Sequence, residues 1–146
     1  MTNQYAQPNS VERAHLEKVI GRLAPSDYGR PAGGPAWTVG GLLAHLAFWD
    51  NRALVLLAKW KKEDIGPSMI DTDLFNESMR PLCNTVPANV IARMAVETAA
   101  AIDKGIDTLS PEMLANVESD GKPVRLNRGL HRIHHLAQIE KALGWG

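Results

Sequence analysis

The chain contains a single cysteine, Cys83, among its 146 residues. An intrachain disulfide is therefore excluded, and a protein without disulfides fits a reducing compartment. A lone cysteine can serve as a nucleophilic or redox-active thiol, but such residues are more often small packed side chains. The sequence alone assigns Cys83 no chemical role.

An excess of charge of either sign is also missing. Sixteen basic residues balance sixteen acidic ones, so no long-range field would draw nucleic acid or an anionic membrane to the surface. The longest uninterrupted apolar run, residues 42–49 with His45 inside it, is far shorter than the ~20 residues of a membrane-spanning helix. Residues 1–8 lack the basic and apolar regions of a signal peptide. We expect a cytoplasmic protein that binds a small-molecule substrate, but no nucleic acid and no membrane.

Apolar residues recur with helical spacing in the first part of the chain. A helix is predicted over residues 9–23, with Asn9 or Ser10 as its N-cap. Residues 24–36 hold three prolines and three glycines and are predicted to be a loop.

The longest helix is predicted over residues 39–62, with Thr38 as its N-cap. Gly40 and Gly41 weaken its first turn, but they would allow another helix to approach closely.

A short helix is predicted over residues 71–80 and should end at Pro81. A third long helix should begin at residues 85–87 and end near residue 110. Residues 115–122 are polar with a turn signal, and Pro123 is expected to open the last helix.

These elements predict an all-α protein with one domain over residues 1–146. The expected fold is a four-helix bundle with a long crossover, carrying a short extra helix, between the second and third long helices. The crossover of about 23 residues exceeds a tight hairpin, so these two helices should run parallel. No strand period and no internal repeat is evident.

The last helix carries three of the five histidines. His131 and His135 are four residues apart, so both imidazoles project from one face and suit two ligands on one metal ion. His134 points toward water and would replace His131 only if the helix were locally distorted. Arg132 stands where a zinc protease would have its general-base glutamate, so that class is set aside.

His45 is the candidate third ligand. It shares a helical face with Leu42, Trp49 and Ala53, so it should face the core. A lone core histidine usually makes only packing or hydrogen-bond contacts, but His45 has a partner pair on another helix. His15, by contrast, forms a single Glu-x-x-His with Glu12 and is assigned to the surface or boundary.

Three further residues are candidates for catalysis. Asp50 and Arg52 lie within about two turns of His45, with Arg52 on nearly the same face. Arg132 projects into the apolar stripe of the last helix, which predicts a bundle that is open at that end. Arg132 either extends to the surface, or recognises an anion or a thiol cofactor.

The chain resembles the DinB/YfiT-like four-helix bundles, and the resemblance covers nearly its whole length. The matching segments are Trp37-Thr38 to Asp50, Phe75-Asn76 and His131-x-x-x-His135-Leu-Ala-Gln-Ile. The resemblance implies one divalent metal ion, commonly nickel, zinc, iron or manganese, held by His45, His131 and His135. It also implies a homodimer and an enzyme that uses a low-molecular-weight thiol, as do mycothiol-dependent maleylpyruvate isomerase and bacillithiol S-transferase. Residues 119–127 lack the elements of the thiol-transferase members, which weakens the thiol expectation more than the metal.

The predicted function is therefore that of a metal-dependent enzyme, a thiol S-transferase or a hydrolase. The ion would activate a thiol or water for attack on a small electrophile. The alternative is a non-catalytic metal-binding or interaction bundle that forms a dimer through its tryptophans. A bundle whose histidines never bind metal is the simplest alternative.

Overall fold

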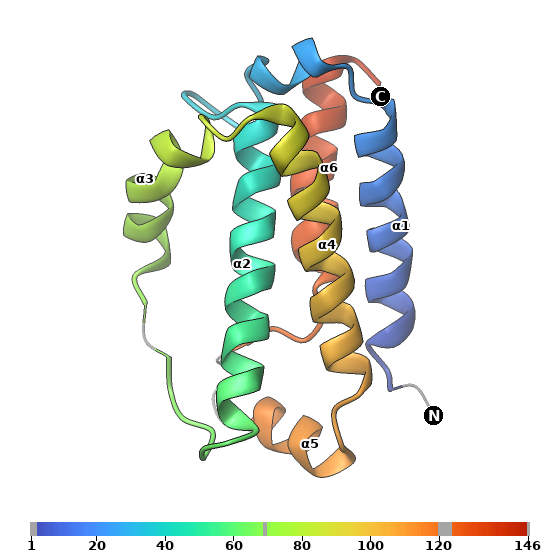
Figure 1. The fold of residues 1–146 in the computed structure, drawn as a ribbon, viewed down its shortest axis with the longest axis vertical. Coiled ribbons are helices and arrows are strands. Elements are labelled where there is room, and N and C mark those ends of the chain that lie inside the picture. Colours follow the sequence, from blue (N-terminus) through green and yellow to red (C-terminus); the bar gives the residue numbers. More distant parts are fainter. Residues whose placement is uncertain (1–2, 69, 120–123, 146) are drawn as a thin grey trace.

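The computed structural model describes residues 3–68, 70–119 and 124–145 (Figure 1). α1, α2, α4 and α6 lie side by side as a bundle. α2 and α4 run in one direction, and α1 and α6 run in the other. Among the described residues no strand forms, and the fold is the predicted all-α bundle. The elements are α1 (Ala6–Arg22), the 3-10 helix η1 (Pro25–Gly29), α2 (Val39–Trp60), α3 (Thr72–Cys83), α4 (Ala88–Asp107), α5 (Pro111–Ser119) and α6 (Gly129–Leu143).

The start of α2 is capped as predicted, and its two glycines serve a packing purpose. The Gly41 N–H donates to the Thr38 hydroxyl over 2.9 Å, and Asn84 accepts from the Thr38 N–H. A Cβ on Gly41 would lie 1.9 Å from Asn84 Oδ1, and one on Gly40 would lie 3.2 Å from the Tyr28 carbonyl oxygen. The glycines therefore admit Asn84 and the η1 backbone, rather than the predicted helix.

The predicted start of α1 at Asn9 or Ser10 is wrong, because the helix begins at Ala6. Asn9 is fully buried. Its side-chain amide donates to the Leu126 carbonyl, and its side-chain oxygen accepts from the Gly129 N–H. Asn9 thus satisfies the backbone at the start of α6 instead of capping its own helix.

The prediction that Pro81 ends the short helix is also wrong. α3 is capped by Asp71, contains Pro81 and continues to Cys83. Pro81 lies in the last turn, where its missing N–H removes one backbone hydrogen bond. The turn still closes, since the Asn84 N–H donates to the Arg80 carbonyl over 3.0 Å.

Residues 111–119 form α5, although residues 115–122 were predicted to be a polar turn. Ser110 and Pro111 were assigned to the end of the preceding helix, but they open α5: the Ser110 hydroxyl accepts from the Met113 N–H over 3.1 Å. Val117 is fully buried and anchors the helix. A serine N-cap followed by proline was the available signal.

The boundaries of α4 and α6 differ slightly from expectation. Pro87 is the N-cap residue of α4, which ends at Asp107 rather than near residue 110. α6 begins at Gly129, and Pro123, predicted to open it, lies outside the described residues.

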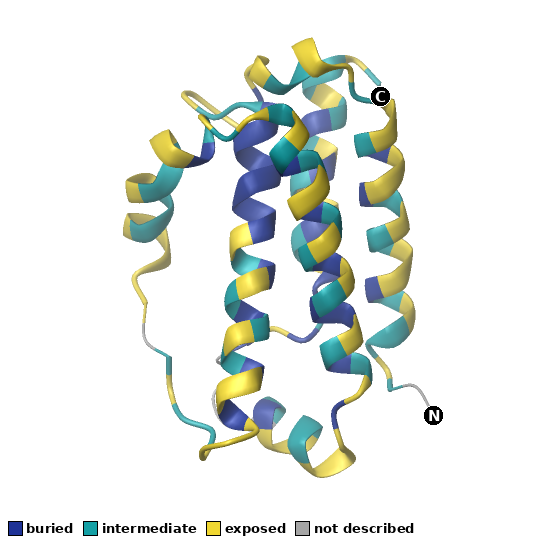
Figure 2. Ribbon diagram, viewed as in Figure 1, coloured by how far each residue is buried: buried dark blue, intermediate teal, exposed yellow. Residues whose placement is uncertain are grey.

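Two apolar clusters make up the core, and a polar layer separates them. Along α2, the first cluster uses residues 39–47 and the second uses Ala53, Leu57 and Trp60. Residues 39–47 of α2 are all buried, as Figure 2 shows for the start of the helix. Asp50 lies between the clusters and is itself buried. Within the described part of the chain, no helix is long and apolar enough to cross a bilayer.

Candidate metal centre

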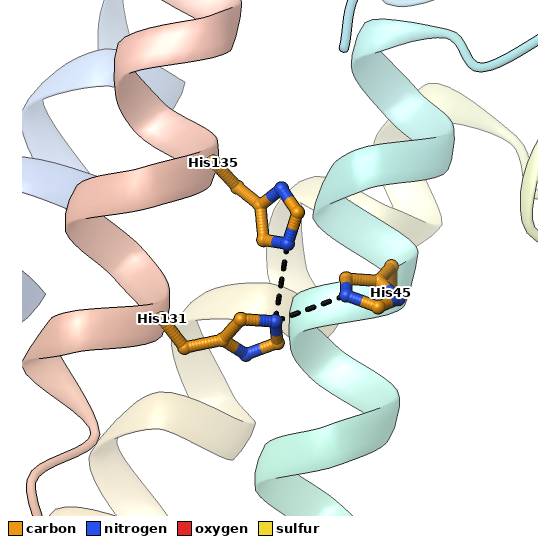
Figure 3. A group of neighbouring side chains, drawn as sticks. All are labelled: His45, His131 and His135. Carbon is orange, nitrogen blue, oxygen red and sulfur yellow. Dashed lines mark hydrogen bonds between the residues drawn. The ribbon is translucent and has the colours of Figure 1, made fainter. Parts of the chain in front are cut away.

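Three imidazoles converge between α2 and α6 (Figure 3). His45 comes from α2, while His131 and His135 project one turn apart from α6. Nε2 of His131 lies 2.9 Å from Nε2 of His45 and 3.1 Å from Nε2 of His135. One candidate ligand atom from each residue lies within 4.8 Å of the other two. The structure therefore brings together the three residues that the sequence predicted.

These nitrogens cannot satisfy one another by hydrogen bonding alone. Nε2 of His131 takes part in both short contacts, yet a neutral ring nitrogen offers either one N–H or one lone pair. A single N–H or lone pair makes one well-aligned hydrogen bond, so it cannot fully satisfy both neighbours. Two ligand nitrogens at about 2.1 Å from one ion would be about 3.0 Å apart at a right angle and about 3.4 Å apart at the tetrahedral angle. The two separations that involve His131, 2.9 and 3.1 Å, are close to the right-angle value.

The second ring nitrogens define which atoms face inward. Nδ1 of His135 lies 2.7 Å from the Gln138 side-chain oxygen, so a proton on Nδ1 leaves the Nε2 lone pair free for a metal. Nδ1 of His45 is buried without a hydrogen-bond partner among the described residues. This atom is not the ring nitrogen that faces the other two histidines, so the Nε2 contacts, and not Nδ1, mark the candidate ligand atoms.

Burial keeps the triad neutral at physiological pH. Desolvation, helped by the neighbouring histidines, lowers the pKa of His45 to about 4 and that of His131 to about 2. Burial also lowers the pKa of His135, against the opposing effect of its bond to Gln138. Neutral imidazoles are the form that binds divalent metals.

The triad opens into a pocket of about 760 Å³. Trp37 and Trp49 contact the His45 ring edge-on, with centroid distances of 5.6 and 6.4 Å. The Trp49 indole N–H donates to the Asn76 side-chain oxygen over 3.0 Å, which connects α2 to α3. The pocket therefore has aromatic walls at the triad and a side formed by α3.

Arg52 also lines the pocket. Its guanidinium donates to the Ser68 hydroxyl over 2.6 Å and lies 5.3 Å from the centre of the Trp49 ring. Of the three catalytic candidates, Arg52 lines this pocket, whereas Asp50 and Arg132 do not.

Arg132 is fully buried, so the expectation that it extends to the surface at an open end of the bundle is wrong. It binds both oxygens of Asp103 over 2.9 and 3.0 Å, and Asp50 over 3.3 Å. Asp50 also accepts from Arg128, and Asp103 from Arg13. These five residues form an arginine–aspartate network that joins α1, α2, α4 and α6. Burial is possible because two carboxylates compensate the Arg132 charge.

Asp103, Arg13 and Arg128 were not predicted to belong to such a network. A signal was present for Asp103, which falls on the buried face of α4 between Ile102 and Ile106. A buried carboxylate on one helix and a buried arginine on another are complementary, and each makes the burial of the other possible.

The remaining titratable candidates are not part of the triad, although the His134 ring lies 4.8 Å from that of His135. His134 is exposed, as predicted, and lies at the pocket lining. His15 lies at the boundary between Glu12 and Glu140, at 3.1 and 2.9 Å. Cys83 is buried, and burial raises the pKa of its thiol, which opposes nucleophilic reactivity.

Comparison with known proteins gives a family match and no individual relative. Searches of curated proteins and of solved structures found no match. The family model described as the mycothiol maleylpyruvate isomerase N-terminal domain matches residues 10–128. This segment includes His45 but ends before His131 and His135. It covers most of the chain, so the protein belongs to the mycothiol maleylpyruvate isomerase N-terminal domain family, a member of the DinB/YfiT-like superfamily.

Proposed function

We propose that this protein is a metal-dependent enzyme in which His45, His131 and His135 hold one divalent ion. The convergence of three neutral Nε2 atoms at a pocket is the observation that carries the proposal. Three histidine ligands leave coordination positions open, as in catalytic rather than structural sites. When bound, a nickel, zinc, iron or manganese ion would lower the pKa of a thiol or water and so supply a nucleophile at neutral pH.

The chain's own residues would orient the reactants. Trp37 and Trp49 shield one side of the triad from water, and Arg52 lines the space beside them. Asp50 and Arg132 lie in the buried network, where they hold α2 and α6 in register. We therefore assign Asp50 and Arg132 as positioning residues and keep Arg52 as the candidate for contact with the reactants.

The reaction we propose is thiol transfer to a small electrophile or its hydrolysis. The family description names mycothiol and an isomerase, which supports a low-molecular-weight thiol as the nucleophile.

A non-catalytic metal-binding or interaction bundle is the second candidate. Val11 of α1 and Leu130 and Ile133 of α6 are each about half exposed. They line a shallow, mainly apolar groove of about 370 Å³. Such a surface supports contact with a second copy of the chain, and thus the homodimer.

The first experiment is elemental analysis of tag-free protein, alongside His45→Ala and the His131→Ala, His135→Ala double variant. His134→Ala is the matched control, since this histidine neighbours the triad without joining it. We expect near-stoichiometric metal in the native protein and in the control, and none in the two triad variants. A native protein that is metal-free and cannot be loaded with any of the four ions would contradict the proposal.

Catalysis is tested separately by thiol consumption with chlorodinitrobenzene as a generic electrophile. A rate that requires both metal and the triad would support the enzyme. Retained metal without metal-dependent turnover for any of several thiols would favour the non-catalytic bundle.

A further inference from the structure

Arg128 presents part of a buried guanidinium to the pocket. Its side chain is almost entirely buried, with 9% exposed. Nε donates to Asp50 Oδ1 over 2.9 Å, and Nη1 donates to the Arg125 carbonyl over 3.2 Å. Its Nη2 has no hydrogen-bond partner among the described residues, and Arg128 lines the pocket. Two sides of the guanidinium are thus held in place, and the third remains available.

The network behind Arg128 has more positive than negative charge. Asp50 and Asp103 are its two carboxylates, and Arg13, Arg128 and Arg132 are its three guanidinium groups. One positive charge is therefore not compensated within the network. Part of this excess is carried by Arg13, whose side chain is 29% exposed and is therefore solvated. Arg128 lies beside the pocket, where an anion would add a favourable charge interaction.

Arg52 adds a second cation on the same pocket. Its hydrogen bonds go to Ser68, which is neutral, and its guanidinium lies against the Trp49 ring. Burial, and then the positive charge of Arg128, lowers the pKa of Arg52. The two arginines thus influence each other electrostatically across the pocket.

The acidic residues of the pocket do not neutralise these arginines. Asp73 and Glu77 of α3 belong to its lining, but Glu77 pairs with Arg80. In the described structure, neither carboxylate forms an ion pair with Arg52 or Arg128. Arg125, which is exposed, adds a further positive charge at the lining.

We infer that Arg128 and Arg52 form an oxyanion subsite beside the histidine triad, and that this subsite binds a carboxylate group of a small organic acid. Guanidinium groups match planar carboxylates, with donors held in fixed directions. Asp50 holds the Arg128 guanidinium in place through Nε. The free Nη2 is therefore oriented before a ligand binds. The role of the subsite in catalysis rests on the proposed function, because it would place the electrophile or the thiol next to the triad.

Binding of succinate to the full-length protein, followed by calorimetry and by tryptophan fluorescence, tests the subsite. Trp37 and Trp49 line the pocket and supply the optical signal. We expect Arg52→Gln to weaken succinate binding about tenfold or more, the effect of losing a charge-assisted hydrogen bond. Arg128→Lys should do the same, because lysine cannot bind Asp50 and the ligand with separate fixed donors. If Arg128→Lys fails to fold, Arg52→Gln decides the question, since Arg52 lies outside the buried network.

Arg93→Gln is the matched control, because it removes the same charge from the exposed face of α4. Succinamide and inorganic phosphate are the comparison ligands. Three outcomes would overturn the inference. They are succinamide binding as tight as succinate binding, phosphate binding as tight as succinate binding, and an equal loss of succinate affinity in Arg52→Gln and Arg93→Gln.

Metal removal separates this inference from the proposed function. We expect succinate to bind after the protein is stripped of metal, still with dependence on Arg52. Binding that disappears with the metal and ignores Arg52 would make the carboxylate a metal ligand and overturn the subsite. A protein that binds succinate through Arg52 but never loads metal would keep the subsite and contradict the proposed metalloenzyme.

Discussion

The histidine triad and the arginine–aspartate network are neighbours on α6, where His131 and Arg132 are consecutive residues. They differ in how fully their buried nitrogen atoms are hydrogen-bonded. In the network, the Nη nitrogens of Arg132 bind Asp50, Asp103 and two backbone carbonyls, and only its Nε lacks a partner among the described residues. In the triad, one nitrogen serves two close neighbours, and Nδ1 of His45 has none.

The difference separates buried polar groups that hold the bundle together from those that could bind a ligand. Groups saturated by fixed partners stabilise one arrangement of the helices. Groups left under-satisfied raise the free energy of a site, and a ligand held by the three Nε2 atoms would recover the part of this cost that comes from their mutual contacts. Arg128 combines both behaviours, since Asp50 holds one side of its guanidinium while the pocket receives the other.

The largest expected effect comes from breaking the network. Arg132→Met keeps a long side chain but leaves Asp50 and Asp103 buried with less compensation. We expect the free energy of unfolding to fall by about 3–5 kcal/mol, as measured by urea denaturation. Adding Asp103→Asn should recover part of this loss, because it removes an uncompensated carboxylate. A loss below about 1 kcal/mol would show that the network does not stabilise the bundle.

Metal loading should stabilise the fold through the triad. Nickel at 100 times its dissociation constant is expected to raise the free energy of unfolding by about 2.7 kcal/mol, because it binds the folded state. His45→Ala should abolish this gain, whereas His134→Ala should retain it. Thermal unfolding with and without nickel checks both. An equal gain in His45→Ala would place the ion elsewhere.

Acid should destabilise the metal-free protein through the triad. The folded-state pKa of His45, about 4, lies below its unfolded value of about 6.5. Between these values the unfolded chain binds more protons, so stability present above pH 6.5 is lost as the pH falls toward 4. For His45 this amounts to about 2 kcal/mol between pH 7 and pH 5. His131 acts in the same direction.

Urea denaturation at pH 7 and pH 5 measures this loss. His45→Ala should show the smaller difference between the two pH values, since one titrating group is gone. A steeper pH dependence in His45→Ala than in the native protein would contradict the assignment.

The smallest change in the free energy of unfolding is expected from an arginine–carboxylate ion pair that is exposed to solvent. Arg93 and Glu97 lie 3.8 Å apart on α4, with side chains 67% and 64% exposed. Arg93→Ala should change the free energy of unfolding by less than about 0.5 kcal/mol, because solvent screens exposed pairs. Urea denaturation of Arg93→Ala and Arg132→Met under the same conditions compares the two losses of unfolding free energy. A loss as large as that of Arg132→Met would remove the distinction between buried and exposed pairs.

Local signals in the sequence were sufficient for much of the fold. Thr38 caps α2 as its residue type predicts, and apolar spacing located α1, α2, α4 and α6. The same signals failed where two interpretations competed. Ser110 and Pro111 could end one helix or begin the next, and the burial of Val117 makes the second arrangement favourable.

The sequence by itself determined that His131 and His135 share a helical face and that His45 faces the core, because helical periodicity fixes side-chain directions within one helix. Tertiary structure alone decided where Arg132 goes. Taken alone, its charge on an apolar stripe predicts an exit to solvent, but Asp50 and Asp103 reach it from α2 and α4. The cost of burying a charge depends on partners that are distant in the chain, and only the packed bundle brings them within hydrogen-bond distance.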